Sequence, residues 1–116
     1  MIPRGGTVAG GLIDRGDVFD ADLPEGGGHP VLVLTRQQAI PVLSSVTVAM
    51  VTTRIRGHVA EVAIGPEAGL TTSSVVNCDS IHTVSKHRLT RRRGRASYET
   101  LQAAGEAVRV ALALDS

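Results

Sequence analysis

Aromatic side chains are nearly absent from this chain of 116 residues, which has one phenylalanine, Phe19, one tyrosine, Tyr98, and no tryptophan. The hydrophobic core must therefore be built from valine, leucine, isoleucine and alanine. Stacking on aromatic rings, the common way to hold single-stranded bases, has almost no side chains to use. Any recognition of nucleic acid would have to depend on backbone groups, polar side chains and the planes of arginine side chains.

Cysteine is also scarce, since Cys78 is the only one, and this excludes a disulfide framework and a cysteine-based metal site. The four histidines have no matching set of cysteine or carboxylate spacings, so no metal and no other cofactor is expected. No apolar run approaches the roughly 20 residues that span a bilayer. Residues 1–11 are too polar and too rich in glycine for a signal peptide. We expect a soluble, cytoplasmic protein that does not associate with membranes.

Short β-branched runs separated by glycine and proline predict a mainly-β domain. Strands are expected at 17–23, 30–35, 46–51, 58–64, 75–78 and 81–84, with a short helical turn at 36–40. Ser97 is a plausible N-cap for a C-terminal helix whose apolar residues recur every three or four positions. This pattern favours a small SH3-like antiparallel barrel, and the segments between strands are too short for the crossover helices of a doubly wound sheet. We expect residues 1–13 to be a flexible leader and 14–116 to be a single domain.

Charge is distributed unevenly although the formal net charge is only +1. Residues 14–25 contain five acidic side chains and one arginine, whereas 86–95 contain six lysine or arginine side chains and no acid. The basic segment is interpreted in two ways: as the electrostatic footprint of a polyanion, or as an ordinary solvated turn.

His29 follows three glycines and precedes the most apolar run in the chain, residues 30–35. A side chain that titrates near neutral pH is therefore placed at the mouth of a buried strand, where it can give or take a proton. The alternative is an exposed turn histidine with no chemical role.

Four blocks, in order, resemble the MazF/PemK family of toxin endoribonucleases. They are Arg-Gly-Asp-Val-Phe at 15–19, Gly-Gly-His-Pro-Val-Leu-Val-Leu at 27–34, Val-Thr-Val-Ala-Met-Val-Thr-Thr at 46–53 and Ser-Val-Val-Asn-Cys-Asp-Ser-Ile-His-Thr-Val at 74–84. The resemblance covers about residues 14–113 and departs from the family at two places. His29 stands where the family usually has arginine, and the loop before it, 24–28, is shorter than usual.

The resemblance implies the PemK/CcdB-like toxin fold, usually as a homodimer. It implies metal-independent cleavage of single-stranded RNA, in which the 2′-hydroxyl attacks the neighbouring phosphate to leave a 2′,3′-cyclic phosphate and a 5′-hydroxyl. It also implies a cognate antitoxin protein that occupies the RNA groove.

Three residues are the candidates for catalysis. His29 can act as acid or base, and Thr52, which matches the family's catalytic threonine, can donate to a phosphate oxygen. Asp79 matches an acidic residue that some members use near the scissile phosphate or for reading bases. By composition alone, Thr52 is an ordinary strand threonine and Asp79 a turn former. The candidates for RNA binding are Thr53, Arg54, Arg56, Asn77, Ser80 and His82.

Two other functions stay open from the sequence. His29 in place of arginine is compatible with a module that binds RNA or antitoxin and no longer cuts. A gyrase poison is the second, because another toxin family shares this fold and a fold does not fix a function.

Overall fold

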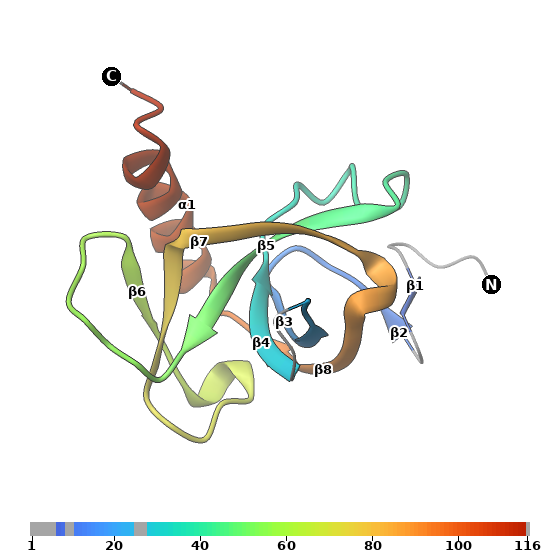
Figure 1. Cartoon of the computed structure of the whole chain (residues 1–116), viewed down its shortest axis with the longest axis horizontal. Helices are drawn as coiled ribbons and strands as arrows, with labels where there is room; N and C mark the ends of the chain where they lie inside the picture. The colour runs from blue at the N-terminus through green and yellow to red at the C-terminus, as the bar shows by residue number, and fades with distance from the viewer. Residues whose placement is uncertain (1–6, 9–10, 25–27, 116) are drawn as a thin grey trace.

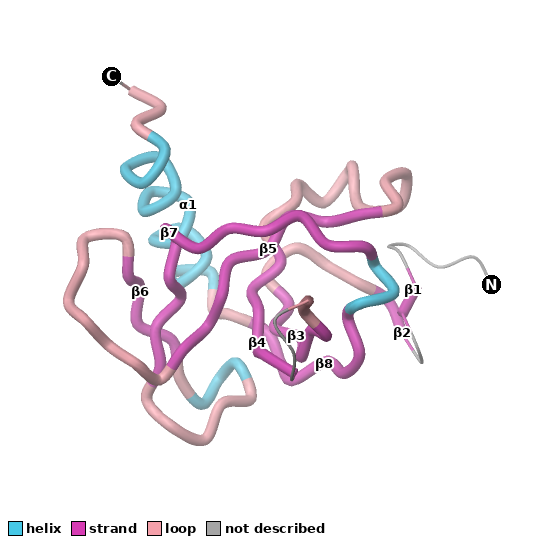
Figure 2. The backbone as a smooth tube through the Cα atoms, in the orientation of Figure 1, coloured by secondary structure: helices cyan, strands magenta, loops and turns pink. Residues whose placement is uncertain are grey.

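The computed structural model describes residues 7–8, 11–24 and 28–115, so most of the expected leader and Glu25–Gly27 of the glycine loop lie outside the described residues. Six strands form one antiparallel sheet in the order β6-β7-β5-β4-β3-β8, while β1 and β2 pair with each other (Figures 1 and 2). The strands are β1 Thr7–Val8, β2 Gly11–Leu12, β3 Asp17–Asp22, β4 Gly28–Val33, β5 Ser45–Thr52, β6 Glu61–Ile64, β7 Ser74–Ser85 and β8 Leu89–Arg95. Short 3₁₀ turns are η1 Pro66–Ala68 and η2 Lys86–Arg88, and the chain ends in helix α1 Tyr98–Leu112. The prediction of a mainly-β fold with a C-terminal helix is confirmed.

Alternation along the strands divides the core into two clusters on opposite faces of the sheet. In β4, Leu32 packs in the cluster that α1 covers, whereas Val31 and Val33 pack in the other cluster with Phe19. In β5, Ala49 and Val51 likewise face the helix side. The sheet is therefore buried on both faces, which explains why β4 and β5 read as almost unbroken apolar runs.

Helix α1 begins as the sequence predicts. The Ser97 hydroxyl oxygen accepts the backbone N–H of Thr100 at 3.1 Å, which satisfies one of the open donors of the first turn. The predicted apolar stripe packs on the core through Leu101, Ala104 and Val108. In the described part of the chain, no helix is long and apolar enough to cross a membrane.

A contact between two glycines brings the ends of the sheet together. Gly69 follows η1, which comes directly after the edge strand β6, and Gly94 lies in the opposite edge strand β8. A Cβ on Gly94 would lie 2.5 Å from the carbonyl carbon of Ala68, and Gly69 has a positive φ of 78°. Backbone therefore packs directly on backbone here, and the curved sheet closes into a barrel.

The uneven charge of the sequence is resolved inside the fold, because acidic β3 pairs with basic β8. Arg93 lies 3.0 Å from Asp20, and Arg92 lies 3.2 Å from Asp17, whose side chain is only 1% exposed. Residues 86–95 are therefore not an ordinary solvated turn: they form a short 3₁₀ turn and a strand, and β3 matches much of their charge. The more exposed pairs contribute little stability, but the pair at buried Asp17 compensates a charge that has left water.

Three further expectations need correction. The strands expected at 75–78 and 81–84 form one strand, β7, which continues through a bulge. The strand expected at 58–64 begins only at Glu61. Residues 36–43 form successive hydrogen-bonded turns in place of a helical turn that stops at Pro41, since Val42 and Leu43 both donate to the Ala39 carbonyl.

Two alanine substitutions should have opposite effects on stability. Gly94→Ala forces a methyl group into the Ala68 backbone, so we expect it to lower the free energy of unfolding by about 1–3 kcal/mol or more. Gly105→Ala places its methyl group in open space within α1 and should raise the free energy of unfolding by roughly 1 kcal/mol. Denaturant titrations of both variants measure these effects, and equal stabilities would contradict the proposed barrel closure.

Candidate functional site

A polar groove opens where β5, β6 and β7 meet, with a volume of about 680 Å³. Ten residues line it, namely Met50, Thr52, Thr53, Arg54, Arg56, His58, Glu61, Asn77, Asp79 and Ser80. Seven of the nine residues selected from the sequence are among them, and they come from two segments far apart in the chain. Only the folded sheet brings these segments together.

The bulge in β7 supplies one wall of the polar groove. Asn77 pairs with Met50 of β5, but the next pair along is Ile81 with Ala49, so β7 carries three extra residues between them. The first, Cys78, is buried against α1, whereas Asp79 and Ser80 line the groove. The Asn77 side chain fixes the bulge by accepting the Asp79 N–H at 3.0 Å. Bulges commonly re-aim side chains in this way beside functional sites.

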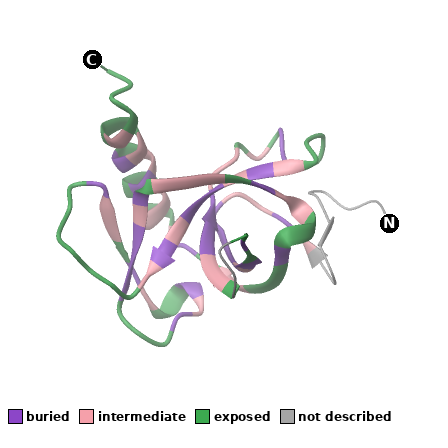
Figure 3. Ribbon diagram, viewed as in Figure 1, coloured by how far each residue is buried: buried purple, intermediate pink, exposed green. Residues whose placement is uncertain are grey.

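The end of β5 supplies the opposite wall. The Thr52 hydroxyl oxygen accepts the backbone N–H of Arg54 at 3.0 Å, which turns the chain out of the strand. The hydroxyl can still donate its own proton, because a hydroxyl has one donor and two acceptor positions. Residues 53–59, here called the groove loop, then run along the exposed rim that Figure 3 shows between β5 and β6.

Two charged or titratable residues of the groove, His58 and Glu61, are missing from the sequence-based selection. A partial signal for Glu61 was present in the sequence, where it alternates with apolar residues, but its pairing with Asn77 of β7 is seen only in the folded sheet. His58 carried a weaker signal, the even spacing 54, 56, 58 of three basic or titratable side chains that all line the groove. Met50 also lines the groove, and its place inside an apolar strand gave no indication of this.

His29 and His82 are not among the residues that line the groove. His82 lies beside it, with its Nε2 3.2 Å from the Ser80 hydroxyl oxygen. His29 is the second residue of β4, whose pairing with β5 ends at Val31 opposite Met50. Two residues further along each strand are His29 and Thr52, so both belong to the same end and the same face of the sheet as Met50. The structure thus places His29 near the groove end of the sheet without making it part of the wall.

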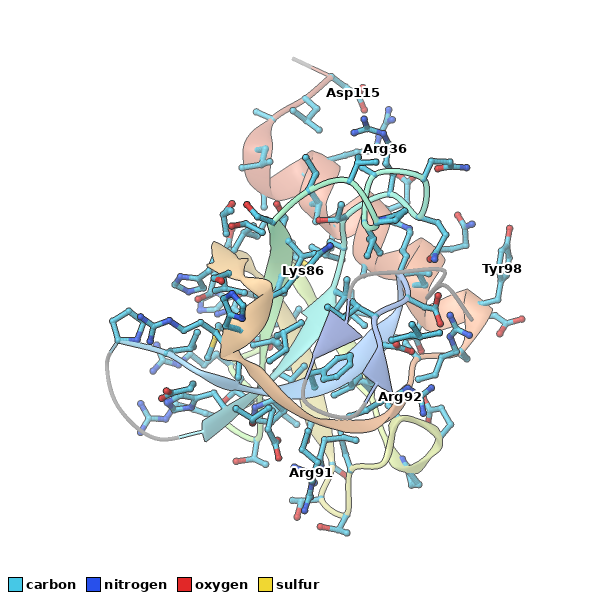
Figure 4. All side chains as sticks on the ribbon, turned by 90° about the vertical axis from the view of Figure 1, so that its right-hand side faces the viewer. Arg36, Lys86, Arg91, Arg92, Tyr98 and Asp115 are labelled. Carbon is cyan, nitrogen blue, oxygen red and sulfur yellow. The ribbon has the colours of Figure 1, made fainter. Side chains whose placement is uncertain are left out.

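The groove combines groups that suit a phosphodiester. Arg54 and Arg56 are exposed cations, Thr52 is a hydroxyl donor, and Asn77 presents an amide. Neither aromatic residue contributes, since Phe19 is in the core and Tyr98 projects from α1 with 71% of its surface exposed (Figure 4). Within the described ranges, no three histidine, cysteine, aspartate or glutamate side chains are grouped to hold a metal ion.

The thiol of Cys78, beneath the bulge, is unreactive at neutral pH. Burial, and to a smaller extent the charge of Asp79, raise the pKa of Cys78 from 9.0 to about 11. Its sulfur lies 3.7 Å from the Ala104 carbonyl oxygen of α1. At neutral pH the thiol is therefore protonated and packs as a small apolar side chain.

Residues 14–112 match the family described as PemK-like, MazF-like toxin of type II toxin-antitoxin system. The chain belongs to this family, which confirms the resemblance seen in the sequence.

Individual relatives agree with this assignment. The chain is 39% identical over 99 residues to the probable endoribonuclease MazF5 of Mycobacterium tuberculosis, an alignment that covers 84% of this chain and 91% of the relative. Among solved structures it is similar to the Mycobacterium tuberculosis toxin MazF-mt6, with a TM-score of 0.79, 37% identity and coverage of 86% and 99% of the two chains. It is also similar to a mycobacterial endoribonuclease in complex with its cognate antitoxin, with a TM-score of 0.81, 30% identity and coverage of 89% and 97%.

The raised pKa of Cys78 predicts a thiol that reagents reach only after unfolding. A disulfide reagent at pH 8 should leave the folded protein unmodified and react fully once denaturant is added. Because the folded thiol ionises later than the unfolded one, its contribution to stability is complete below pH 9 and is lost as the pH rises towards 11. Rapid labelling of the folded protein at pH 8 would contradict this account.

Proposed function

We propose that this protein is the toxin of a type II toxin-antitoxin system and acts as an endoribonuclease on single-stranded RNA. The observation that carries the proposal is the polar groove itself. In a chain of the MazF/PemK family, it unites Thr52, Asp79 and the two arginines of the groove loop.

In the proposed reaction, the 2′-hydroxyl of one nucleotide attacks the adjacent phosphorus and the bond to the 5′-oxygen of the next nucleotide breaks. The proton of the 2′-hydroxyl goes to a base, and the leaving oxygen receives a proton from an acid. The products are a 2′,3′-cyclic phosphate and a 5′-hydroxyl, and no metal ion takes part. Thr52 donates to a non-bridging phosphate oxygen, where Arg54 and Arg56 also stabilise the developing charge.

His29 is proposed as the acid or base that serves this groove from the start of β4. Asp79 orients the substrate or accepts hydrogen bonds from base edges. Thr53, Asn77, Ser80 and His82 extend the RNA contact along the bulge and the groove loop. Without aromatic platforms, binding depends largely on phosphate charge and should weaken steeply with salt.

The proposal includes a cognate antitoxin that blocks the groove, a homodimer and a cytoplasmic location. Support for the antitoxin comes from family membership and from the structural relative that is described as a complex with its cognate antitoxin.

The purified protein should cut mixed single-stranded RNA in the presence of EDTA. Product ends are the measurement: sequencing should find 2′,3′-cyclic phosphates and 5′-hydroxyls at a short recurring motif. Thr52→Val, which keeps the strand's shape and removes the hydroxyl, should lower the rate by about 10²-fold or more. A folded protein that binds RNA but yields no cyclic phosphate at any salt concentration would instead indicate a binding module.

Histidine variants test the assignment of the acid or base. We expect His29→Ala to lower kcat by about 10²–10⁴-fold, whereas His58→Ala, a matched change in the groove loop, should act mainly on RNA affinity. Single-turnover rates with both variants separate the two effects. If His29→Ala cuts at the wild-type rate, the role given to His29 is wrong.

A further inference from the structure

The groove loop is held in place by one carboxylate, that of Glu61. Glu61 Oε1 accepts the backbone N–H of Gly57 at 2.8 Å and that of Arg56 at 3.1 Å, while its Oε2 lies 3.2 Å from the same Arg56 nitrogen. Two successive backbone donors therefore converge on one anionic side chain, an arrangement that resembles the anion-binding nests of other loops. Such charge-assisted bonds are stronger than bonds between neutral groups.

Local geometry explains why the two amides can converge. Gly57 has a positive φ of 77°, a conformation that side chains rarely adopt, and its Cβ position is open space. The turn at Gly57 brings the loop back to β6, where Glu61 is the first residue and its N–H donates to the His58 carbonyl at 3.1 Å. Glu61 is half-buried while the whole groove loop above it is exposed. The carboxylate belongs to a strand of the sheet and is thus the fixed point to which the exposed loop is bonded.

The loop forms a wall with two different sides. Arg54, Arg56 and His58 line the polar groove, whereas Ile55 lines a separate hollow beside η1. The two ends of the wall are fixed by side chains of the groove, Thr52 at Arg54 and Glu61 at Arg56 and Gly57. Displacing the Glu61 end would move the cations of the loop relative to Thr52 and Asp79.

We propose that Glu61 is a positioning residue for RNA cleavage, which fixes the groove loop so that Arg54 and Arg56 face the phosphate. This inference rests on the proposed endoribonuclease function and deepens it. Glu61 acts through the backbone of the loop and does not itself meet the reacting atoms.

A positioning role and a purely electrostatic role for Glu61 predict opposite changes in kcat/KM when its carboxylate is removed. A carboxylate in an RNA groove repels phosphate, so its removal alone would tighten RNA binding and leave cleavage unchanged or faster. Loss of the loop anchor would instead lower turnover, because small misplacements of binding groups can cost about 10²-fold in rate. The sign of the change in kcat/KM therefore separates the two roles.

The experiment compares Glu61→Gln, Glu61→Ala and Glu67→Gln with the wild type on a single-stranded RNA that the wild type cuts. Both Glu61 variants lose the same charge, but glutamine keeps one oxygen that can accept the Gly57 N–H. Glu67 is an exposed acid of η1 that lines the hollow outside the groove, so its variant controls for net charge. We expect kcat/KM to fall about 10- to 100-fold for alanine, less for glutamine, and not to fall for Glu67→Gln.

Amide hydrogen exchange gives a second measurement that does not depend on activity. In Glu61→Ala, the Arg56 and Gly57 amides should exchange faster, while the Cys78 amide, bonded to the Ala60 carbonyl at 2.9 Å, should stay protected. Equal cleavage by all four proteins, or faster cleavage by both Glu61 variants, would overturn the positioning role and leave the endoribonuclease function intact. If the wild type cuts no RNA, the proposed function fails, and unchanged exchange at Arg56 and Gly57 would show that the anchor fails as well.

Discussion

The three extra residues of β7 are the constraint on which both the core and the groove depend. Strand alternation would place residues 77–81 on two flat faces of the sheet, but the bulge lets Cys78 point under α1 while Asp79 and Ser80 line the groove. The Cys78 N–H bonds to Ala60 at 2.9 Å and so also fixes the point where the groove loop returns to β6. One irregularity thus couples helix packing, the β5–β6 connection and the position of Asp79 in the groove.

The charges of the chain serve two separate purposes. Along β3 and β8 they pair with each other, with buried Asp17 beside Arg92 and Asp20 beside Arg93, and they support the closure of the barrel. In the groove, Arg54 and Arg56 are exposed, and the contact with Glu61 is made by the backbone N–H of Arg56 and not by its guanidinium group. An internally paired cation gains little from RNA, whereas an exposed one can still neutralise phosphate.

Most of the candidate site could be predicted because the family blocks and the strand ends carry its residues. Thr52 and Asp79 were selected in this way and both line the groove. Glu61 and His58 were missed, since their proximity to Asp79 follows from the pairing of β6 with β7, which no local pattern encodes. His29 shows the reverse case: its position before a buried strand was plain, yet the pairing of β4 with β5 ends before reaching it.

By itself the sequence determined the mainly-β class, the helix from its cap at Ser97, and the family, because apolar periodicity, capping and ordered motifs are local properties. Tertiary structure decided the pairing of acidic β3 with basic β8, the contact of Gly69 with Gly94, and the bulge. These features join residues that are distant in the chain, so they contribute to the free energy of folding only when the folded chain brings those residues into contact. The consequence of having few aromatic side chains is seen only in the folded protein, where the groove is lined by arginine, hydroxyl and amide groups.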